Sequence, residues 1–337
     1  MHLSLDGEKI MRENKLNFGI IIRIFLSLLP LLFGMPTLAT IFCAYNIAMT
    51  FIAFGPLPTV VSSLTAVAAA MFLASSYYGV EGEVSGLVFG LQAVLCATGC
   101  IAGLFIRKDF YKGLTLATSG MLAPQLIYAR TTAHANGMSL ADMLVPSKDE
   151  IAEIISPFIE FPQYMNEASP FAPEHIAELV REFTVMLIPS ALIISSMVLA
   201  YIVMWAVAAP LRRMPNHQKI HSFSHIRLPR ICTILTLVLV AVLLYGFGGK
   251  NIMASTVMLN MIFVFSAMAL FAGISLLDFY LRKSISIKFL RVIIHMIIAF
   301  NFFPIYILAA FLDSFANFRK LPKESDKKGG GNYETKK

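Results

Sequence analysis

Charged residues are scarce in this chain. Asp, Glu, Lys and Arg together make up 14% of the 337 residues, whereas hydrophobic residues make up 57%. Soluble domains carry roughly 25% charged residues, so the composition excludes a soluble globular protein. Apolar runs of about 17 to 25 residues recur along the chain, and each is long enough for a helix to cross a bilayer. Because lipid offers the backbone no hydrogen-bond partner, these runs must be helices.

The common motifs of catalysis and nucleotide binding are also missing. The chain contains no Gly-x-x-x-x-Gly-Lys phosphate-binding loop and no His-Glu-x-x-His metalloprotease motif. Ser119-Gly120 follows Ala117, where a rhomboid-like Gly-x-Ser-Gly motif would need Gly. We therefore expect that the protein is not an enzyme, and that any use of ATP comes from partner chains.

Metal ligands and disulfide partners are few. The four cysteines all lie in apolar runs, which argues against a disulfide framework. A metal site also needs further nitrogen, oxygen or sulfur ligands, and none stands beside the pair on one helix face, Cys96 and Cys100. The histidines His217, His221 and His225 recur at spacing four, but their loop is basic and has no carboxylate. The sequence thus predicts no metal and no cofactor, and anionic lipid is the natural partner of this basic loop.

The Lys and Arg residues behind the net charge of +7 are distributed among short loops and tails, so they indicate how the chain is oriented across the membrane. We therefore expect no nucleic-acid partner. The loop after residue 209 carries only basic charges, which places it in the cytoplasm; they are Arg212, Arg213, Lys219, Arg227 and Arg230. The polar hinge over residues 75–83, which carries Glu81 and Glu83, belongs outside. By parity, the amino terminus lies in the cytoplasm of this multi-pass membrane protein.

The pattern predicts an all-α fold, a polytopic transmembrane helical bundle of nine or ten membrane segments with an extracytoplasmic amphipathic insert. Five parts follow from it. They are a cytoplasmic N-terminal segment (1–17), a five-helix membrane bundle (18–130), the acidic insert (131–183), the C-terminal membrane helices (184–318) and a basic, disordered cytoplasmic tail (319–337).

The acidic insert departs from the membrane pattern. Ser147 followed by Glu150 predicts a capping box at the start of an amphipathic helix, and a second short helix is expected near Pro173. Two such helices suit either a packed extracytoplasmic cap with a solvated acidic face or a lid that gates a substrate.

The last apolar stretch poses a topological conflict. As one helix, residues 285–318 would deliver the basic tail to the outside. Asn301-Phe302-Phe303-Pro304 lies at its middle, so we predict a hairpin that returns the carboxyl terminus to the cytoplasm; nine segments with an external tail is the alternative. Asp278 and Arg282 form an i, i+4 pair near its start. Arg291 and His295 share a helix face, which favours a structural hydrogen bond between helices over proton transfer.

Small residues recur at spacing four in the stretch from Gly55 to Gly103. Such residues line one helix face, where two backbones can approach closely in lipid. The spacing predicts a packing face or a partner face made of Ala66, Ala70, Ala74, Gly86, Gly90, Gly99 and Gly103.

The closing sequence from Phe311 to Lys320, with its motif Asp313, Asn317, Phe318 and Arg319, resembles the YybS-like family of uncharacterised bacterial membrane proteins. Together with the Gly-Pro break, the Gly-rich helix and the acidic insert, the resemblance covers about residues 15 to 321. It implies location in the bacterial cytoplasmic membrane. The family is similar in turn to the substrate-binding subunits of energy-coupling-factor transporters. That similarity implies docking to a coupling membrane protein driven by ABC-type ATPases, through alanines at spacing four.

Two functions suit these features. The first is a substrate-capture subunit of a transporter, whose unknown small-molecule substrate would enter an outward pocket with aromatic and charged side chains. The candidate lining residues are Tyr77, Tyr78, Glu81, Glu83, Gln125, Tyr128 and Arg130. The second is a membrane scaffold or assembly factor in envelope or spore processes, which would act through the basic loop and the tail.

Overall fold

The computed structural model describes residues 19–107, 109–158, 173–211, 226–247 and 252–319. All regular elements within them are helices, which confirms the all-α fold. The chain divides into an N-terminal unit, Met1–Ile220, and a C-terminal unit, His221–Lys337. The predicted N-terminal segment and basic tail lie outside the described residues, apart from Arg319 at the start of the tail, and so does the part of the basic loop that contains the three histidines.

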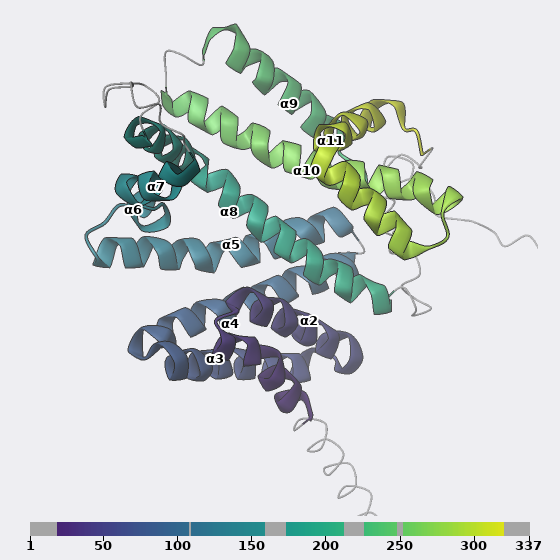
Figure 1. Cartoon of the computed structure of the whole chain (residues 1–337). Coiled ribbons are helices and arrows are strands. Elements are labelled where there is room, and N and C mark those ends of the chain that lie inside the picture. Colours follow the sequence, from purple (N-terminus) through teal and green to yellow (C-terminus); the bar gives the residue numbers. More distant parts are fainter. Residues whose placement is uncertain (1–18, 108, 159–172, 212–225, 248–251, 320–337) are drawn as a thin grey trace, which may run out of the picture. The chain divides into compact units, whose positions relative to one another are not determined.

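The N-terminal unit begins with the apolar helix Gly19–Phe33. Five of its helices form the body of the unit, and two short helices form the cap described below (Figure 1). The body helices are α2 (Pro36–Phe54), α3 (Pro56–Tyr78), α4 (Val80–Cys100, continued by a π-helical turn, Ile101–Arg107), α5 (Phe110–Ala135) and α8 (Pro173–Leu211).

Single glycines make the turns between α2, α3 and α4. Gly55 has φ of +85° and Gly79 has φ of +70°, a region that L residues rarely adopt. Pro56 then occupies the first turn of α3, where its missing N–H has no helical partner to lose. The polar hinge expected over residues 75–83 is therefore much shorter in the structure, because helix continues on both sides of Gly79.

The small residues bring the backbones of three helices together. A Cβ atom at Gly86 of α4 would lie 2.4 Å from the carbonyl oxygen of Ala70 in α3. At the other end of α4, a Cβ at Gly103 would lie 2.0 Å from Cα of Gly113 in α5. Ala66, Ala70 and Ala74 are fully buried. The alanine face of α3 is thus covered by α4, within the same unit.

The cap consists of α6 (Leu140–Leu144), α7 (Lys148–Ile155) and the first turns of α8. Ser147 and Glu150 form the predicted capping box at the start of α7. A small apolar cluster of Val145, Ile151 and Ala177 joins α7 to α8. Two ion pairs at its surface, Arg181 with Asp142 and Lys148 with Glu178, tie α8 to the short helices.

The cap and the first of the membrane helices predicted after residue 183 share one continuous helix, α8. We expected a short helix at Pro173 and a separate membrane helix from residue 183, but α8 runs unbroken through 39 residues. At 1.5 Å per residue these 39 residues span about 58 Å, roughly twice the 30 Å of bilayer hydrocarbon. Its first turns therefore extend beyond the apolar layer and carry the cap.

The cap is expected to loosen in acid. Hydrogen bonds from Ser139 and Arg181 lower the pKa of Asp142, and hydrogen bonds from the Ser147 backbone and hydroxyl lower the pKa of Glu150. A carboxyl group whose pKa is lower in the folded state adds stability above its unfolded pKa of about 4, and this stability is lost as the pH falls through the folded pKa. Amide hydrogen exchange, corrected for intrinsic rates, should show protection of α6 and α7 at pH 7 that falls at pH 3. Asp142→Asn should already reduce it at pH 7, and equal protection of α6 and α7 at both pH values would contradict the prediction.

The C-terminal unit contains α9 (Arg230–Val242, continued by a π-helical turn, Leu243–Phe247), α10 (Ile252–Ser284) and α11 (Lys288–Ala316). Its apolar core is small and joins α10 and α11 to the residues before α9. The chain in α11 leaves helical geometry at Phe302, and the halves Phe289–Ile298 and Asn301–Ala316 meet at 98°. Pro304 explains the break, because it lacks the N–H that would bond to residue 300 and its ring clashes with that carbonyl.

The break therefore lies where the sequence predicted it, but the two halves do not form a spanning hairpin. Phe289–Ile298 extends only about 15 Å, half of the hydrocarbon thickness. Both ends of α11 nevertheless contact the last third of α10. Near its start, Arg291 lies 4.0 Å from Asp278, and beyond its end Tyr280 donates a 3.1 Å hydrogen bond to the carbonyl oxygen of Phe318.

Five of the described helices are long and apolar enough to cross a membrane, which agrees with a polytopic bundle. The bent pair in α11 would make a sixth, and Gly19–Phe33 and Arg230–Tyr245 are shorter apolar helices. This is fewer than the nine or ten segments that we expected. The difference arises because α11 is bent, two runs are short, and α5 carries Lys112, Gln125 and Arg130 along its length.

Because the end of α11 returns to the end of α10, we expect a carboxyl-terminal tag to lie on the same side of the membrane as the α10–α11 connection. Arg282 and Lys283 at this connection predict that the side is the cytoplasm. A protease added outside intact cells should leave such a tag uncut, while lysed cells lose it. A tag placed within the cap, after residue 137, is the matched control and should be cut in intact cells. Trimming of the carboxyl-terminal tag in intact cells would contradict the arrangement.

Candidate functional site

The predicted pocket residues fall at one end of the α4–α5 pair. The hydroxyl groups of Ser85 and Tyr128 lie 3.1 Å apart, which joins the first turns of α4 to the last turns of α5. Glu83, two residues before Ser85, is exposed. On α5, Gln125 is half-buried and Arg130 is exposed. The structure thus brings Tyr128 against the first turns of α4, and the exposed Glu83 and Arg130 lie near this contact in sequence, on α4 and α5.

The remaining pocket candidates are only partly placed. Tyr77, in the last turn of α3, is exposed, and a Cβ at Gly34 would lie 3.8 Å from its hydroxyl oxygen. Tyr78 ends α3 and Glu81 lies in the first turn of α4, but their side chains are outside the described part of the structure. Ser85 was missed by the sequence argument. Ser85 lies four residues after Glu81 and so on the same helix face, and this spacing could have added it to the predicted pocket residues.

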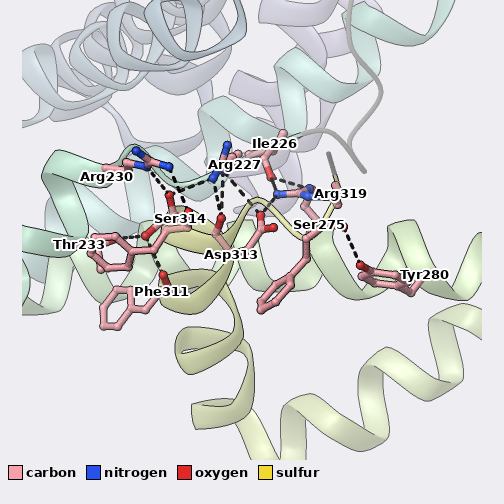
Figure 2. Close-up of polar contacts among 12 residues, drawn as sticks. Ile226, Arg227, Arg230, Thr233, Ser275, Tyr280, Phe311, Asp313, Ser314 and Arg319 are labelled. Atoms are coloured by element: carbon pink, nitrogen blue, oxygen red, sulfur yellow. Dashed lines mark hydrogen bonds and ion pairs between the residues drawn. The ribbon is translucent and has the colours of Figure 1, made fainter. Parts of the chain in front are cut away.

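A second group of polar side chains closes the C-terminal unit (Figure 2). Arg319 donates hydrogen bonds to three groups. They are the carboxylate of Asp313 (2.7 Å), the carbonyl oxygen of Ile226 (2.9 Å) and the hydroxyl of Ser275 (3.0 Å). The side chains of Arg319 and Asp313 are only 1% and 2% exposed. We call these four residues, with Arg227 and Arg230, the C-terminal polar cluster.

The closing motif of Asp313, Asn317, Phe318 and Arg319 forms the turn that brings this cluster together. Asn317 has φ of 49° and ψ of 54°, the left-handed conformation that ends helices, and its N–H bonds to the carbonyl of Asp313. This turn reverses the chain so that Arg319 reaches Asp313. Phe318 is exposed, and its carbonyl accepts the hydrogen bond from Tyr280. Asp313, Asn317 and Arg319 therefore form the turn itself, and Phe318 contributes its carbonyl oxygen to the contact with α10.

Two arginines of the basic loop bind the end of α11. Arg227 donates to the carbonyl oxygens of Asp313 (2.7 Å) and Ser314 (2.9 Å), and Arg230 donates to Ser314 (2.9 Å) and Phe315 (3.0 Å). The last carbonyls of a helix lack helical partners and carry partial negative charge, so cations stabilise them. The guanidinium groups of these two arginines thus bind backbone within the unit, and the lipid partner expected for the basic loop stays a prediction.

A third group lies along α10 and α11. Arg282 contacts Asp278 at 2.7 Å, which confirms the predicted i, i+4 pair. Arg291 turns to the same carboxylate, whereas His295 pairs with Tyr306, whose hydroxyl lies 3.0 Å from Nδ1. His295 and Tyr306 are 11 residues apart and would lie about 16 Å apart along a straight helix. The bend in α11 is what brings them together, so this contact joins the two halves of α11.

Comparison with known proteins gives one family. Residues 21–314 match a family described as "Predicted membrane protein (DUF2232)". The match includes Asp313 and ends before Asn317 and Arg319. No curated protein and no solved structure matches the chain.

Proposed function

The chain belongs to the DUF2232 family of predicted membrane proteins, and from that premise we propose that it captures a small solute as a subunit of a transporter energised by partner ATPases. The Ser85–Tyr128 contact is the observation that carries the proposal, because it joins α4 and α5 at the end of the helix pair where the exposed Glu83 and Arg130 also lie. Ligand sites in membrane bundles form between helices and use a few polar groups for specificity. The small-residue interfaces hold the backbones that present these groups in fixed positions.

The partner surface is proposed to differ from the one that the resemblance suggests. Energy-coupling-factor subunits dock through alanines at spacing four, but α4 covers Ala66, Ala70 and Ala74. The opposite face of α3 exposes Leu57, Leu64 and Phe72. A coupling membrane protein would dock on that face more readily, because docking there needs no separation of α3 from α4.

The orientation proposed for this role is that of a bacterial cytoplasmic membrane protein with both termini in the cytoplasm. The α3–α4 turn then faces outward, where a solute arrives. The contact of both α11 ends with α10 supports a cytoplasmic carboxyl terminus, since the last turn of α10 carries the basic residues Arg282 and Lys283.

A ligand screen tests the proposal. The purified full-length protein is heated with a panel of vitamins, other heteroaromatic solutes and divalent metal ions, and its unfolding temperature is measured. A ligand at 100 times its Kd stabilises the folded state by about 2.7 kcal/mol, which is readily detected. Tyr128→Phe should weaken the response, whereas Tyr245→Phe, at an exposed tyrosine of the C-terminal unit, should not. Absence of any response, or equal responses in both variants, would count against solute capture.

A membrane scaffold remains the second candidate, and one contact favours it. Arg319 bonds directly to the carbonyl of Ile226, so the end of the basic loop and the start of the basic tail lie side by side. A partner that binds both segments would therefore meet them where they join, at Ile226 and Arg319. Deletion of residues 323–337 with no effect on partner binding would count against this role of the tail.

A further inference from the structure

Positive charge is concentrated where α10 ends and α11 begins. The described part of the C-terminal unit has two carboxylates, Asp278 and Asp313, and Arg319 occupies the second within the polar cluster. Asp278 is left as the one described carboxylate at the α10–α11 connection. It faces Arg282 and Arg291, and Lys283 lies beside them in sequence. This junction therefore carries more positive than negative charge at a helix end.

The geometry leaves these cations available to a further anion. Arg282 bonds to one oxygen of Asp278, while its side chain is 43% exposed. Arg291 approaches the other oxygen only to 4.0 Å and is largely buried. The Lys283 ammonium group lies 4.6 Å from the centre of the Phe279 ring and 5.5 Å from that of Tyr280. None of the ion pairs in the described ranges includes Lys283.

An apolar surface continues from these cations along α11. Phe289 is 74% exposed, and Leu290 and Val292 are also exposed, so the first turns of α11 present large hydrophobic side chains beside the charges. Tyrosine is enriched at the level of the lipid headgroups, and Tyr280 lies in the last two turns of α10 beside these cations. Cations with an apolar surface below them match the chemistry of a phospholipid, with phosphate above and acyl chains beneath.

We propose that the α10–α11 junction, residues 279–292, binds the phosphate of an anionic phospholipid headgroup. Arg282 and Lys283 supply the accessible charges, Arg291 supplies a partly neutralised charge behind them, and the exposed side chains of α11 contact the acyl chains. A free phosphate ion would lack the apolar contacts, so the site is one for membrane lipid. Each basic group near an anionic surface contributes about 1 kcal/mol, which is about fivefold in affinity.

Native mass spectrometry of the full-length protein tests this binding. The protein, purified in mild detergent, is titrated with phosphatidylglycerol or with phosphatidylcholine, and lipid-bound species are counted. Wild type should bind phosphatidylglycerol more tightly. The variant Arg282→Gln/Lys283→Gln should lose about 25-fold in that affinity and little in affinity for phosphatidylcholine. Lys283→Gln alone leaves the Asp278–Arg282 pair intact and should lose about fivefold.

The matched control removes two cations from the N-terminal unit. Arg107 is exposed and Lys112 pairs with Asp109 at 3.1 Å, so Arg107→Gln/Lys112→Gln changes the same net charge near a similar ion pair. Phosphatidylglycerol affinity should stay within about twofold of wild type in this control, less than the change from one cation. The proposal is overturned if the control loses as much as the junction variant. It is also overturned if both lipids bind alike, or if Lys283→Gln has no effect.

Discussion

Replacing Arg319 with Ala is expected to destabilise the C-terminal unit by about 3–5 kcal/mol, because truncating one partner of a buried ion pair leaves an uncompensated charge. Asp313 is 2% exposed and would lose its 2.7 Å contact with the guanidinium group. The carbonyl of Ile226 and the hydroxyl of Ser275 would lose a donor at the same time. The free energy of unfolding, measured by denaturant titration in mixed micelles, checks the prediction.

A double substitution separates lost charge pairing from lost packing. Asp313→Leu with Arg319→Met removes both charges and keeps apolar volume, and replacement of a buried pair in this way is often neutral or stabilising. We expect the double variant to be more stable than Arg319→Ala. If Arg319→Ala costs less than about 1 kcal/mol, which is typical of exposed ion pairs, then the pair is not buried as described.

The second large effect is expected at Gly103. Replacement by Ala puts a Cβ 2.0 Å from Cα of Gly113 and 3.2 Å from the carbonyl oxygen of Asp109, so backbone must move. Overpacking in a core costs about 1–3 kcal/mol, and we expect a value near 3 kcal/mol because no flexible side chain can give way. The yield of monodisperse protein and its unfolding temperature are the measurements.

Gly19→Ala is the matched control for this substitution. Gly19 is also helical, and no atom lies within 4 Å of the position that its Cβ would take. Ala is the better helix former, so Gly19→Ala should leave stability unchanged or slightly raised. If Gly19→Ala loses as much stability as Gly103→Ala, the close α4–α5 contact is not the reason why Gly103→Ala is destabilising.

Local sequence patterns predicted the helices well. Apolar runs within the predicted membrane bundle (18–130) became helices such as α2, and the capping box at Ser147 and Glu150 formed as expected. Hydrophobic runs and capping residues act within a few positions along the chain, so their consequences can be predicted without knowledge of the fold. Pro304 likewise marked the break in α11, because its effect on the backbone is local.

The contacts that span long stretches of sequence could not be predicted in this way. Arg227 contacts carbonyls that lie 86 and 87 residues further along the chain, and no local pattern distinguishes it from a topogenic arginine. The partner of Arg319 was equally hidden, since it depends on the turn at Asn317 and on the approach of α10. The small residues predicted a close helix contact, but not that α4 would use one end for α3 and the other for α5.

The length of α8 shows that hydropathy does not predict where a helix ends. Its first turns carry Glu174, Glu178, Arg181 and Glu182, so the sequence predicted a boundary near residue 183. Helical backbone hydrogen bonding continues through such a boundary, because polarity decides the surroundings of a helix and not where it ends. The ends are set by Pro, Gly and capping residues, and in α8 the internal Pro189 does not stop the helix.

Purification of the full-length protein from native membranes in mild detergent, followed by mass spectrometry of all co-purifying chains, tests the proposed function most directly. Solute capture predicts a coupling membrane protein and ABC-type ATPases in stoichiometric amounts. Leu64→Ser and Phe72→Ser on the exposed face of α3 should reduce the recovery of the partners. Bulky residues on the buried alanine face are the control, because they should disturb folding before they disturb partner binding. Recovery of envelope or division proteins alone, or of the chain by itself, would contradict the capture subunit.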